Sequence, residues 1–288
     1  AWHGGTAKDG RTPNCRLILY DTNSGKWYTN DKGPARSYHA AFTSEERYLH
    51  VVGGWDGDRR THEVDTFDIR GNVWIPTSSR GFPEGGGLSS HSVNGVKTTG
   101  GKIEALVIGR LGGLRTQRCH SALLRLEGDL RRGFEYRTIE ENISSRGGHA
   151  AIALTPTTLA LFGGRADAYV GLQKENVNLH DTKPLQRLLW KREVSDFQTT
   201  SCKETELTGR RYHAACLLSG HAVLLHGGEP FNQMMIGHQG VSAHMWIIGR
   251  NGSRLKVSQP TLPPLAGHAM VPIGNGERLA VVGGLTKG

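Results

Sequence analysis

The stretch VVGGWDGDRR, residues 51–60, places β-forming apolar residues directly before two adjacent glycines. A glycine pair weakens a strand unless the backbone there needs a freedom that a side chain would remove. The same order of apolar run and glycine pair returns along the chain, which indicates a repeated unit. The pairs are Gly4-Gly5, Gly53-Gly54, Gly163-Gly164, Gly227-Gly228 and Gly283-Gly284, with Gly109-Arg110 as a degenerate copy.

Two further features recur at fixed places in the unit. Asp21 to Trp27 and Asp68 to Trp74 share one spacing, and each tryptophan follows a turn. Four strand-like segments in about 50 residues are typical of a β-propeller blade. We therefore expect the glycine pairs to end second strands, where a β-carbon would block the neighbouring backbone, and the tryptophans to pack between adjacent blades. A histidine precedes each pair but the first, at His39, His91, His149, His213 and His268.

Three segments carry a family resemblance: VVGGWDGDRR at 51–60, GLSSH at 87–91 and VIGRLGGLRTQR at 107–118. Together with the repeat, they make the chain resemble the kelch-repeat β-propeller proteins. The resemblance implies an all-β fold, a non-catalytic role in protein binding and an A-type cyclin as one partner.

We predict a single kelch-type β-propeller domain over residues 1–288, with almost no helix outside an insertion at 165–190. The first blade lacks its inner strands and the last lacks its outer ones. Closure as five blades through a composite blade is one reading, and a six-bladed ring with a longer complete chain is the other. A start at Ala1 rather than methionine favours six. The expected blade segments are about 1–29, 36–75, 89–137, 146–195, 210–258 and 268–288.

Composition indicates the kind of partner. The formal net charge of +9 favours an acidic one, such as nucleic acid, an anionic membrane surface or the tubulin of a cytoskeletal or ciliary assembly. Residues 104–133 hold no aromatic residue for base stacking, which argues against nucleic acid. No apolar stretch reaches the ~18 residues that span a bilayer, so no membrane partner is expected. Free thiols and a cytoplasmic location are predicted from four scattered cysteines, Cys15, Cys119, Cys202 and Cys216.

The sequence offers little support for catalysis. Histidines that recur at one place in successive blades are explained by the repeat, so we expect no metal site among them. No G-x-S-x-G, H-E-x-x-H or EF-hand pattern is present, and we expect no catalytic residue and no cofactor. Two alternatives to a binding scaffold stay open. One is a structural subunit of a cytoskeletal or ciliary assembly, and the other is a sugar-epimerising propeller enzyme.

Loop lengths predict where a protein partner binds. In an up-and-down blade the 2–3 and 4–1 connections share one face, and here they are the long ones. They are expected at 55–62, 76–90, 110–118, 165–176, 195–209 and 229–241. The arginines of 110–118 are expected on a loop that departs from the repeat, whereas those of 125–137 are expected along a solvated blade edge. The predicted partner-binding residues are Trp55, Arg59, Arg60, Arg110, Arg115, Arg118, Tyr169 and Phe231.

Overall fold

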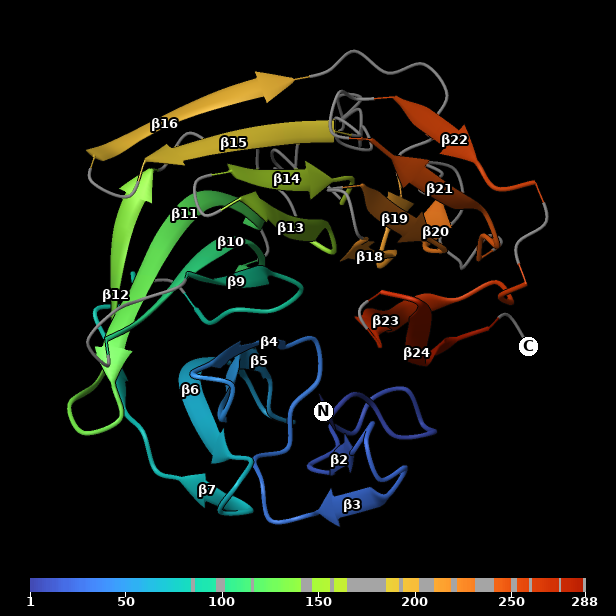
Figure 1. Cartoon of the computed structure of the whole chain (residues 1–288). Helices are drawn as coiled ribbons and strands as arrows, with labels where there is room; N and C mark the ends of the chain where they lie inside the picture. The colour runs from blue at the N-terminus through green and yellow to red at the C-terminus, as the bar shows by residue number, and fades with distance from the viewer. Residues whose placement is uncertain are drawn as a thin grey trace. The chain divides into compact units, whose positions relative to one another are not determined.

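The regular structure of the chain is β-strand in a computed structural model, and the described residues contain no helix (Figure 1). Contacts group the chain into two compact units, which are described one at a time. Unit 1 is Ala1–Gly147 with Ala168–Gln173, and unit 2 is Gly148–Asp167 with Lys174–Gly288. The structure describes residues 1–83, 86–96, 102–114, 117–140, 147–155, 158–164, 185–191, 194–201, 210–218, 222–230, 241–249, 253–258, 261–274 and 276–286.

Unit 1 contains three sheets, and neighbouring strands follow chain order except where β8 lies beside β12. The first has the order β1-β2-β3, with β1 (Trp2–His3), β2 (Leu17–Tyr20) and β3 (Trp27–Asn30). The second has the order β4-β5-β6-β7, with β4 (Ala40–Ser44), β5 (Tyr48–Trp55), β6 (Arg60–Asp68) and β7 (Val73–Ile75). The third has the order β8-β12-β11-β10-β9, with β8 (Ser79–Arg80), β9 (Ser92–Val96), β10 (Ile103–Leu114), β11 (Gln117–Asp129) and β12 (Gly133–Glu140).

Unit 2 repeats the same antiparallel pattern. One sheet holds β13 (Ala150–Thr155), β14 (Thr158–Phe162), β15 (Leu185–Lys191) and β16 (Val194–Ser201). The next holds β18 (Ala214–Leu217), β19 (Val223–His226), β21 (Met245–Ile248) and β22 (Arg254–Lys256). Two strand pairs complete the unit, β23 (Ala266–Ile273) with β24 (Arg278–Leu285) and β17 (Arg210–Arg211) with β20 (Glu229–Pro230).

The all-β prediction is confirmed for the described residues, as a series of small antiparallel sheets. Two details differ from the expected boundaries. β16 runs to Ser201, past the segment 146–195 and into the expected connection 195–209. β8 lies in the connection expected at 76–90 and pairs in parallel with β12, so it adds an outer strand to the third sheet. Of the insertion at 165–190, residues 185–190 belong to β15 and the rest lies outside the described residues.

The segment 110–118 is not the predicted loop. β10 continues to Leu114 and β11 begins at Gln117, so both strands extend through most of it. The pairing register shifts between Ile108 and Arg110 and again between Leu111 and Leu114. Bulges let a strand absorb extra residues without ending, which explains why the glycines of GRLGG do not break the hairpin.

The glycine pair of VVGG is required by close approach and by backbone conformation. Gly53 and Gly54 have φ values of 63° and 99°, which L-residues with a side chain rarely adopt. A β-carbon on Gly53 would lie 2.6 Å from Leu88 Cβ, and one on Gly54 would lie 2.8 Å from His39 Cβ. Gly227, Gly228, Gly283 and Gly284 have positive φ in the same way, as do Gly4, Gly5, Gly163 and Gly164.

The repeated histidines lie against these pairs. The Cε1 atom of His39 is 2.8 Å from where Gly4 would carry a β-carbon, while its Cβ faces Gly54 in its own sheet. His268 does the same in unit 2, where its Cε1 faces Gly227 at 2.8 Å and its Cβ faces Gly284 at 2.9 Å. Each of these two histidines therefore fills the space that the missing side chains leave between successive sheets.

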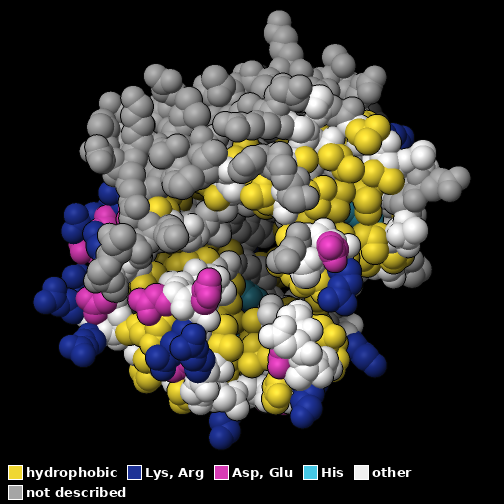
Figure 2. All heavy atoms as spheres, viewed as in Figure 1, with side chains coloured by type: hydrophobic (Ala, Val, Ile, Leu, Met, Phe, Trp, Pro, Cys, Tyr) yellow, Lys and Arg dark blue, Asp and Glu magenta, His cyan; other side chains and the backbone are white. Residues whose placement is uncertain are grey.

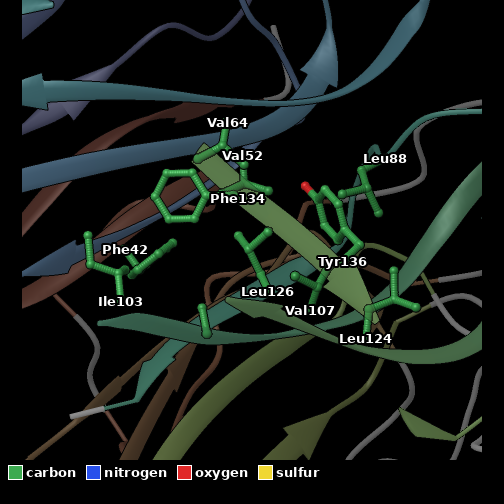
Figure 3. Packing of buried hydrophobic residues seen from close by; sticks show 11 residues of the cluster. Phe42, Val52, Val64, Leu88, Ile103, Val107, Leu124, Leu126, Phe134 and Tyr136 are labelled. Atoms are coloured by element: carbon green, nitrogen blue, oxygen red, sulfur yellow. The ribbon is translucent and has the colours of Figure 1, made fainter. Parts of the chain in front are cut away.

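Adjacent sheets bury their faces against each other. In unit 1 one cluster joins the second and third sheets, and Figure 3 shows Val52 and Val64 close to Phe134 and Leu126. In unit 2 Trp246 on β21 is 7% exposed and packs with Phe162 of the preceding sheet. This sheet lacks the late tryptophan of its repeat, and a tryptophan one strand earlier covers the same face.

The two late tryptophans have different surroundings. Trp74 packs with Phe67 of its own sheet and with His3 and Leu17 of the first sheet. Trp27 is 65% exposed, and its ring lies at a tilt against that of Tyr20, with 4.6 Å between ring centroids. The predicted role between blades is therefore seen for Trp74 and not for Trp27, because no described residue of unit 1 covers the face that carries Trp27.

Candidate functional site

A cleft of about 510 Å³ lies in unit 1 beside the connection from β5 to β6. Its other wall is the segment that follows β8, so the 2–3 and 4–1 connections of the second sheet meet at one site. We call it the Trp55–Phe82 cleft. It is lined by Trp55, Arg59, Arg60, Thr61, His62, Glu63, Phe82, Pro83, Gly86 and Gly87.

A tight turn sets the first wall. Asp56 begins the turn, and its carboxylate accepts hydrogen bonds from the backbone N–H groups of Asp58 at 2.9 Å and Arg59 at 2.8 Å. Burial opposes ionisation of Asp56, but these N–H donors and the nearby arginines outweigh it and hold its pKa below the ordinary carboxyl value. The turn is therefore stiffened by its own aspartate and projects Arg59 into solvent, where the side chain is 79% exposed.

Backbone contacts fix the second wall. The N–H of Leu88 donates to Thr61 O at 2.9 Å, and the N–H of Gly54 donates to Leu88 O at 2.8 Å. Gly87 lies so near β6 that a β-carbon on it would be 2.6 Å from the Thr61 nitrogen. The segment after β8 is thereby held against both strands that form the first wall.

Aromatic packing positions the apolar end of the cleft. Phe82 stacks flat on His62, with 4.9 Å between ring centroids and an interplanar angle of 2°. The edge of Tyr136 meets Phe82 at 5.1 Å, and the Tyr136 hydroxyl donates to His62 O at 2.7 Å. Burial raises the pKa of that hydroxyl, so it stays protonated and keeps the bond. Phe82 is therefore anchored to the core beneath it.

Arg60 is held at the charged end. Its Nε donates to Ser89 Oγ at 2.8 Å, and its guanidinium carbon lies 5.9 Å from the centroid of the Trp55 ring. A cation over an indole face is attracted by the ring's electron density. The side chain is thus oriented before any ligand arrives, with its remaining N–H groups directed by Ser89 and Trp55.

The structure brings three of the eight predicted partner-binding residues to this cleft, namely Trp55, Arg59 and Arg60. Arg110 and Arg118 lie on β10 and β11, and their side chains are outside the described part of the chain, as are Arg115, Tyr169 and Phe231. Sequence reasoning missed Phe82 and Pro83. A Phe-Pro pair in a connection rich in glycine was the available signal, because apolar residues there have no strand to bury them.

Two histidines that were not predicted, His3 and His226, lie beside the repeated histidines. His3 directly precedes the first glycine pair, and its ring lies 5.1 Å from that of His39. In unit 2 His226 precedes Gly227, and its Nδ1 shares a 3.0 Å hydrogen bond with His268 Nε2. Burial lowers the pKa of His3 and of His268 to about 4, so both rings are neutral near pH 7.

Three further predictions concern metal sites, cysteines and membrane-spanning segments. Among the described residues no group of three or more His, Cys, Asp or Glu is placed to hold a metal ion. Cys15 and Cys216 are free thiols, while the side chains of Cys119 and Cys202 lie outside the described set. No helix in the described portion is long and apolar enough to cross a membrane.

Two of the third sheet's arginines with described side chains pair with carboxylates. Arg125 pairs with Glu104 at 3.4 Å and with Glu127 at 3.5 Å, and Arg137 pairs with Glu135 at 3.3 Å. In Figure 2 the Lys and Arg side chains lie singly or in small groups, several of them beside acidic ones. The positive net charge is therefore spread over the visible face, and it does not single out a binding site there.

Four-stranded antiparallel sheets in repeats of about 50 residues, most of them with a glycine pair, are typical of kelch-repeat proteins. The chain is similar to a member of this family, and kelch repeats imply a β-propeller. It is 31% identical over 231 residues to Kelch domain-containing protein 9 of Homo sapiens, across 76% of this chain and 65% of that protein.

The protein of the same name from Mus musculus is 35% identical over 173 residues, across 56% of this chain and 48% of the mouse protein. The chain thus spans less than two thirds of the curated relatives it matches. No protein-family model matches the chain.

Proposed function

We propose that the chain is a non-catalytic interaction module that binds a protein partner on the face formed by its 2–3 and 4–1 connections. The observation that carries the proposal is the Trp55–Phe82 cleft, where one connection of each kind meets. Its lining combines a tryptophan, a phenylalanine and two arginines, the residue types that most often anchor protein interfaces. Kelch propellers typically mediate protein binding, which agrees with this site.

The proposal includes three finer statements. The complete protein has six blades, and it acts in the cytoplasm, where the thiols of Cys15 and Cys216 stay reduced. An A-type cyclin, the partner that the family resemblance implies, is the first purified protein to test. A class average from electron microscopy with another number of blades would contradict the first statement without touching the binding face.

The test compares opposite faces of one sheet. Arg60→Glu changes the cleft, and Arg70→Glu changes an exposed arginine in the β6–β7 hairpin on the opposite end of the strands. We expect purified A-type cyclin, or a partner first identified by affinity purification from cytosol, to bind the wild type and Arg70→Glu alike. Arg60→Glu should weaken that binding at least about tenfold, because charge reversal replaces attraction by repulsion. Circular dichroism checks that both variants fold.

Three results would count against the proposal. Loss of binding on Arg70→Glu with retention on Arg60→Glu would move the interface to the hairpin face. Co-sedimentation with microtubules that is unaffected by Arg60→Glu would favour a structural subunit of a cytoskeletal assembly. Turnover of an acidic sugar that is lost on substitution of an arginine would favour an enzyme.

A further inference from the structure

Arg60 differs from every comparable arginine in the described part of the chain. Five arginines with described side chains are partly buried, Arg60 among them. The other four each pair with a carboxylate: Arg36 with Asp65 at 3.1 Å, Arg47 with Asp68 at 2.5 Å, Arg125 with Glu104 at 3.4 Å and Arg211 with Glu229 at 3.0 Å. Arg60 forms no ion pair with any described carboxylate, and its one hydrogen bond goes to a neutral hydroxyl.

An oriented, half-desolvated guanidinium without a counter-charge is suited to bind an anion. Its Nε is engaged by Ser89, and the planar fork of the remaining N–H groups matches the two oxygens of a carboxylate. Because the Arg60 side chain is already held near the Trp55 ring, it loses less conformational entropy when a ligand binds. Arg60 is therefore pre-organised for a carboxylate that the described part of the chain does not supply.

Two of the described acidic residues near the cleft are already engaged elsewhere. Asp56 caps its own turn, and its Oδ2 lies 3.9 Å from Arg59 Nε, a long contact for an exposed side chain. Glu63 accepts a hydrogen bond from Ser79 Oγ at 3.1 Å and lies 4.0 Å from the His62 ring. Arg59 and Arg60 thus supply cationic side chains at the charged end of the cleft.

The other end of the cleft selects for an apolar group. Phe82 and Pro83 form it, and Phe82 is fixed between His62 and Tyr136. A volume of about 510 Å³ is within the range of ligand clefts and accommodates a few side chains of a peptide. A ligand that fits the whole cleft therefore carries a carboxylate and an apolar side chain close together.

We propose that the Trp55–Phe82 cleft binds an acidic peptide segment of a partner protein, with a carboxylate on Arg60 and a neighbouring apolar side chain against Phe82 and Pro83. The inference rests on the proposed function and names the chemistry that the binding face recognises. It assigns Arg59 to attraction of the acidic segment from solution, since its side chain is 79% exposed and its contact with Asp56 is a long one of 3.9 Å. Arg60 selects for a carboxylate in the bound segment.

The probe is a displayed library of random 12-residue peptides selected on the purified chain. We expect the enriched peptides to place Asp or Glu beside Phe, Trp, Leu or Pro. A fluorescein-labelled enriched peptide should bind R60Q at least about tenfold more weakly than wild type, because a charge-assisted bidentate contact is lost. Binding to R70Q, changed at an exposed arginine of the β6–β7 hairpin, should match the wild type. Affinity should fall as NaCl rises.

A second variant moves the affinity in the opposite direction. E63Q removes the negative charge in the lining while its amide oxygen still accepts from Ser79. It should strengthen binding of the acidic peptide by about two- to threefold, because a like charge is removed. This gain would be expected of a cleft that binds anions and not of a variant that merely folds poorly.

Several outcomes overturn the inference. Enriched peptides without Asp or Glu, no enrichment at all, or equal binding by R60Q would each do so. A phosphate-bearing peptide that binds better than its Asp counterpart would reassign the cleft to a phosphorylated partner. If the full partner still requires Arg60 while acidic peptides fail, the proposed function stands and this inference falls. If acidic peptides bind at Arg60 but the partner docks on the hairpin face, the proposed function is the one that fails.

Discussion

Trp27 and Trp74 occupy the same position in two neighbouring sheets and have opposite surroundings. Both follow an aspartate at the same spacing and both pair with an aromatic residue of the adjacent strand, Tyr20 or Phe67. Trp74 is covered by the first sheet, whereas Trp27 is 65% exposed. The aspartate-to-tryptophan spacing therefore specifies a hairpin. Its tryptophan is buried only where a neighbouring sheet packs against it.

The largest expected effect tests this difference directly. Trp74→Ala should lower the free energy of unfolding by about 3 kcal/mol, because it opens a cavity between two sheets. Trp27→Ala should change the free energy by less than about 0.5 kcal/mol, as is usual for an exposed side chain. Urea unfolding followed by circular dichroism measures both.

A third variant isolates the contact. A β-carbon on Gly33 would lie 2.5 Å from Trp74 Cε2, so Gly33→Ala should destabilise the wild type and have little effect in the Trp74→Ala background. Equal losses for Trp27→Ala and Trp74→Ala would break the comparison, since they would mean that another surface covers Trp27 in solution.

A smaller effect should appear as the solution is acidified. His3 lies at the same interface, with its ring 5.2 Å from Trp74, and it faces His39 and the charge of Arg36. Burial lowers its pKa to about 4, whereas the unfolded chain takes up the proton near pH 6.5. The unfolded state therefore binds more protons between these values, and stability is full above pH 6.5 and falls towards pH 4.

At pH 5, protonation of His3 in the unfolded chain should lower the free energy of unfolding by about 2 kcal/mol relative to pH 7. The matched variant is His3→Val, because Val52 holds the equivalent position before the next glycine pair. Urea unfolding at pH 7 and at pH 5 should show a smaller difference for His3→Val than for wild type. The same difference in both would show that another group controls the acid sensitivity.

The smallest effect compares the two aspartates that begin the hairpins. Asp68 accepts from Arg47 and from the N–H groups of Arg70 and Gly71, and the Arg47 hydrogen bond is the main reason that its pKa is lowered to about 2. Asp68→Asn should lower stability by about 1 kcal/mol, since Arg47 is partly screened by solvent. The stabilisation that ionised Asp68 gives the folded state is present above about pH 4 and is lost as the pH falls through 2.

Asp21 makes the same kind of turn with Asn23 and Ser24, and its hydrogen bond from Ser24 lowers its pKa, but no arginine pairs with it. Asp21→Asn should therefore have a smaller effect than Asp68→Asn in the same urea titration at pH 7. An equal or larger effect would show that the turn itself, and not the ion pair, accounts for the loss.

The sequence predicted features that depend on local constraints. Positive φ and close approach allow only glycine at Gly53 and Gly54, so the pair identifies the end of a strand wherever it recurs. Trp55, Arg59 and Arg60 were predicted for a similar reason, because they adjoin that strand end and lie on a long connection. The structure places them in the lining of one cleft, and their role in binding stays a prediction.

The remaining features depend on residues far apart in the chain, which a local pattern does not reveal. The anchoring of Phe82 by Tyr136, the pairing of β8 with β12 and the exposure of Trp27 are of this kind. The hairpin of β10 and β11 was missed because register shifts between Ile108 and Arg110 and between Leu111 and Leu114 accommodate glycines that usually signal a loop.

The strand β8 has a consequence for dividing the protein into fragments. The sequence repeat that contains His91 begins after Ser79 and Arg80, yet these two residues form the outer strand beside β12. A fragment cut at the repeat boundary would leave β12 with an unpaired edge, open to pairing with another chain. A soluble fragment containing the third sheet should therefore start before Ser78, whose carbonyl accepts from the N–H of Phe134 at 2.8 Å. The boundaries of the sequence repeat therefore differ from the boundaries of the folded sheet, and a stable fragment has to follow the sheet.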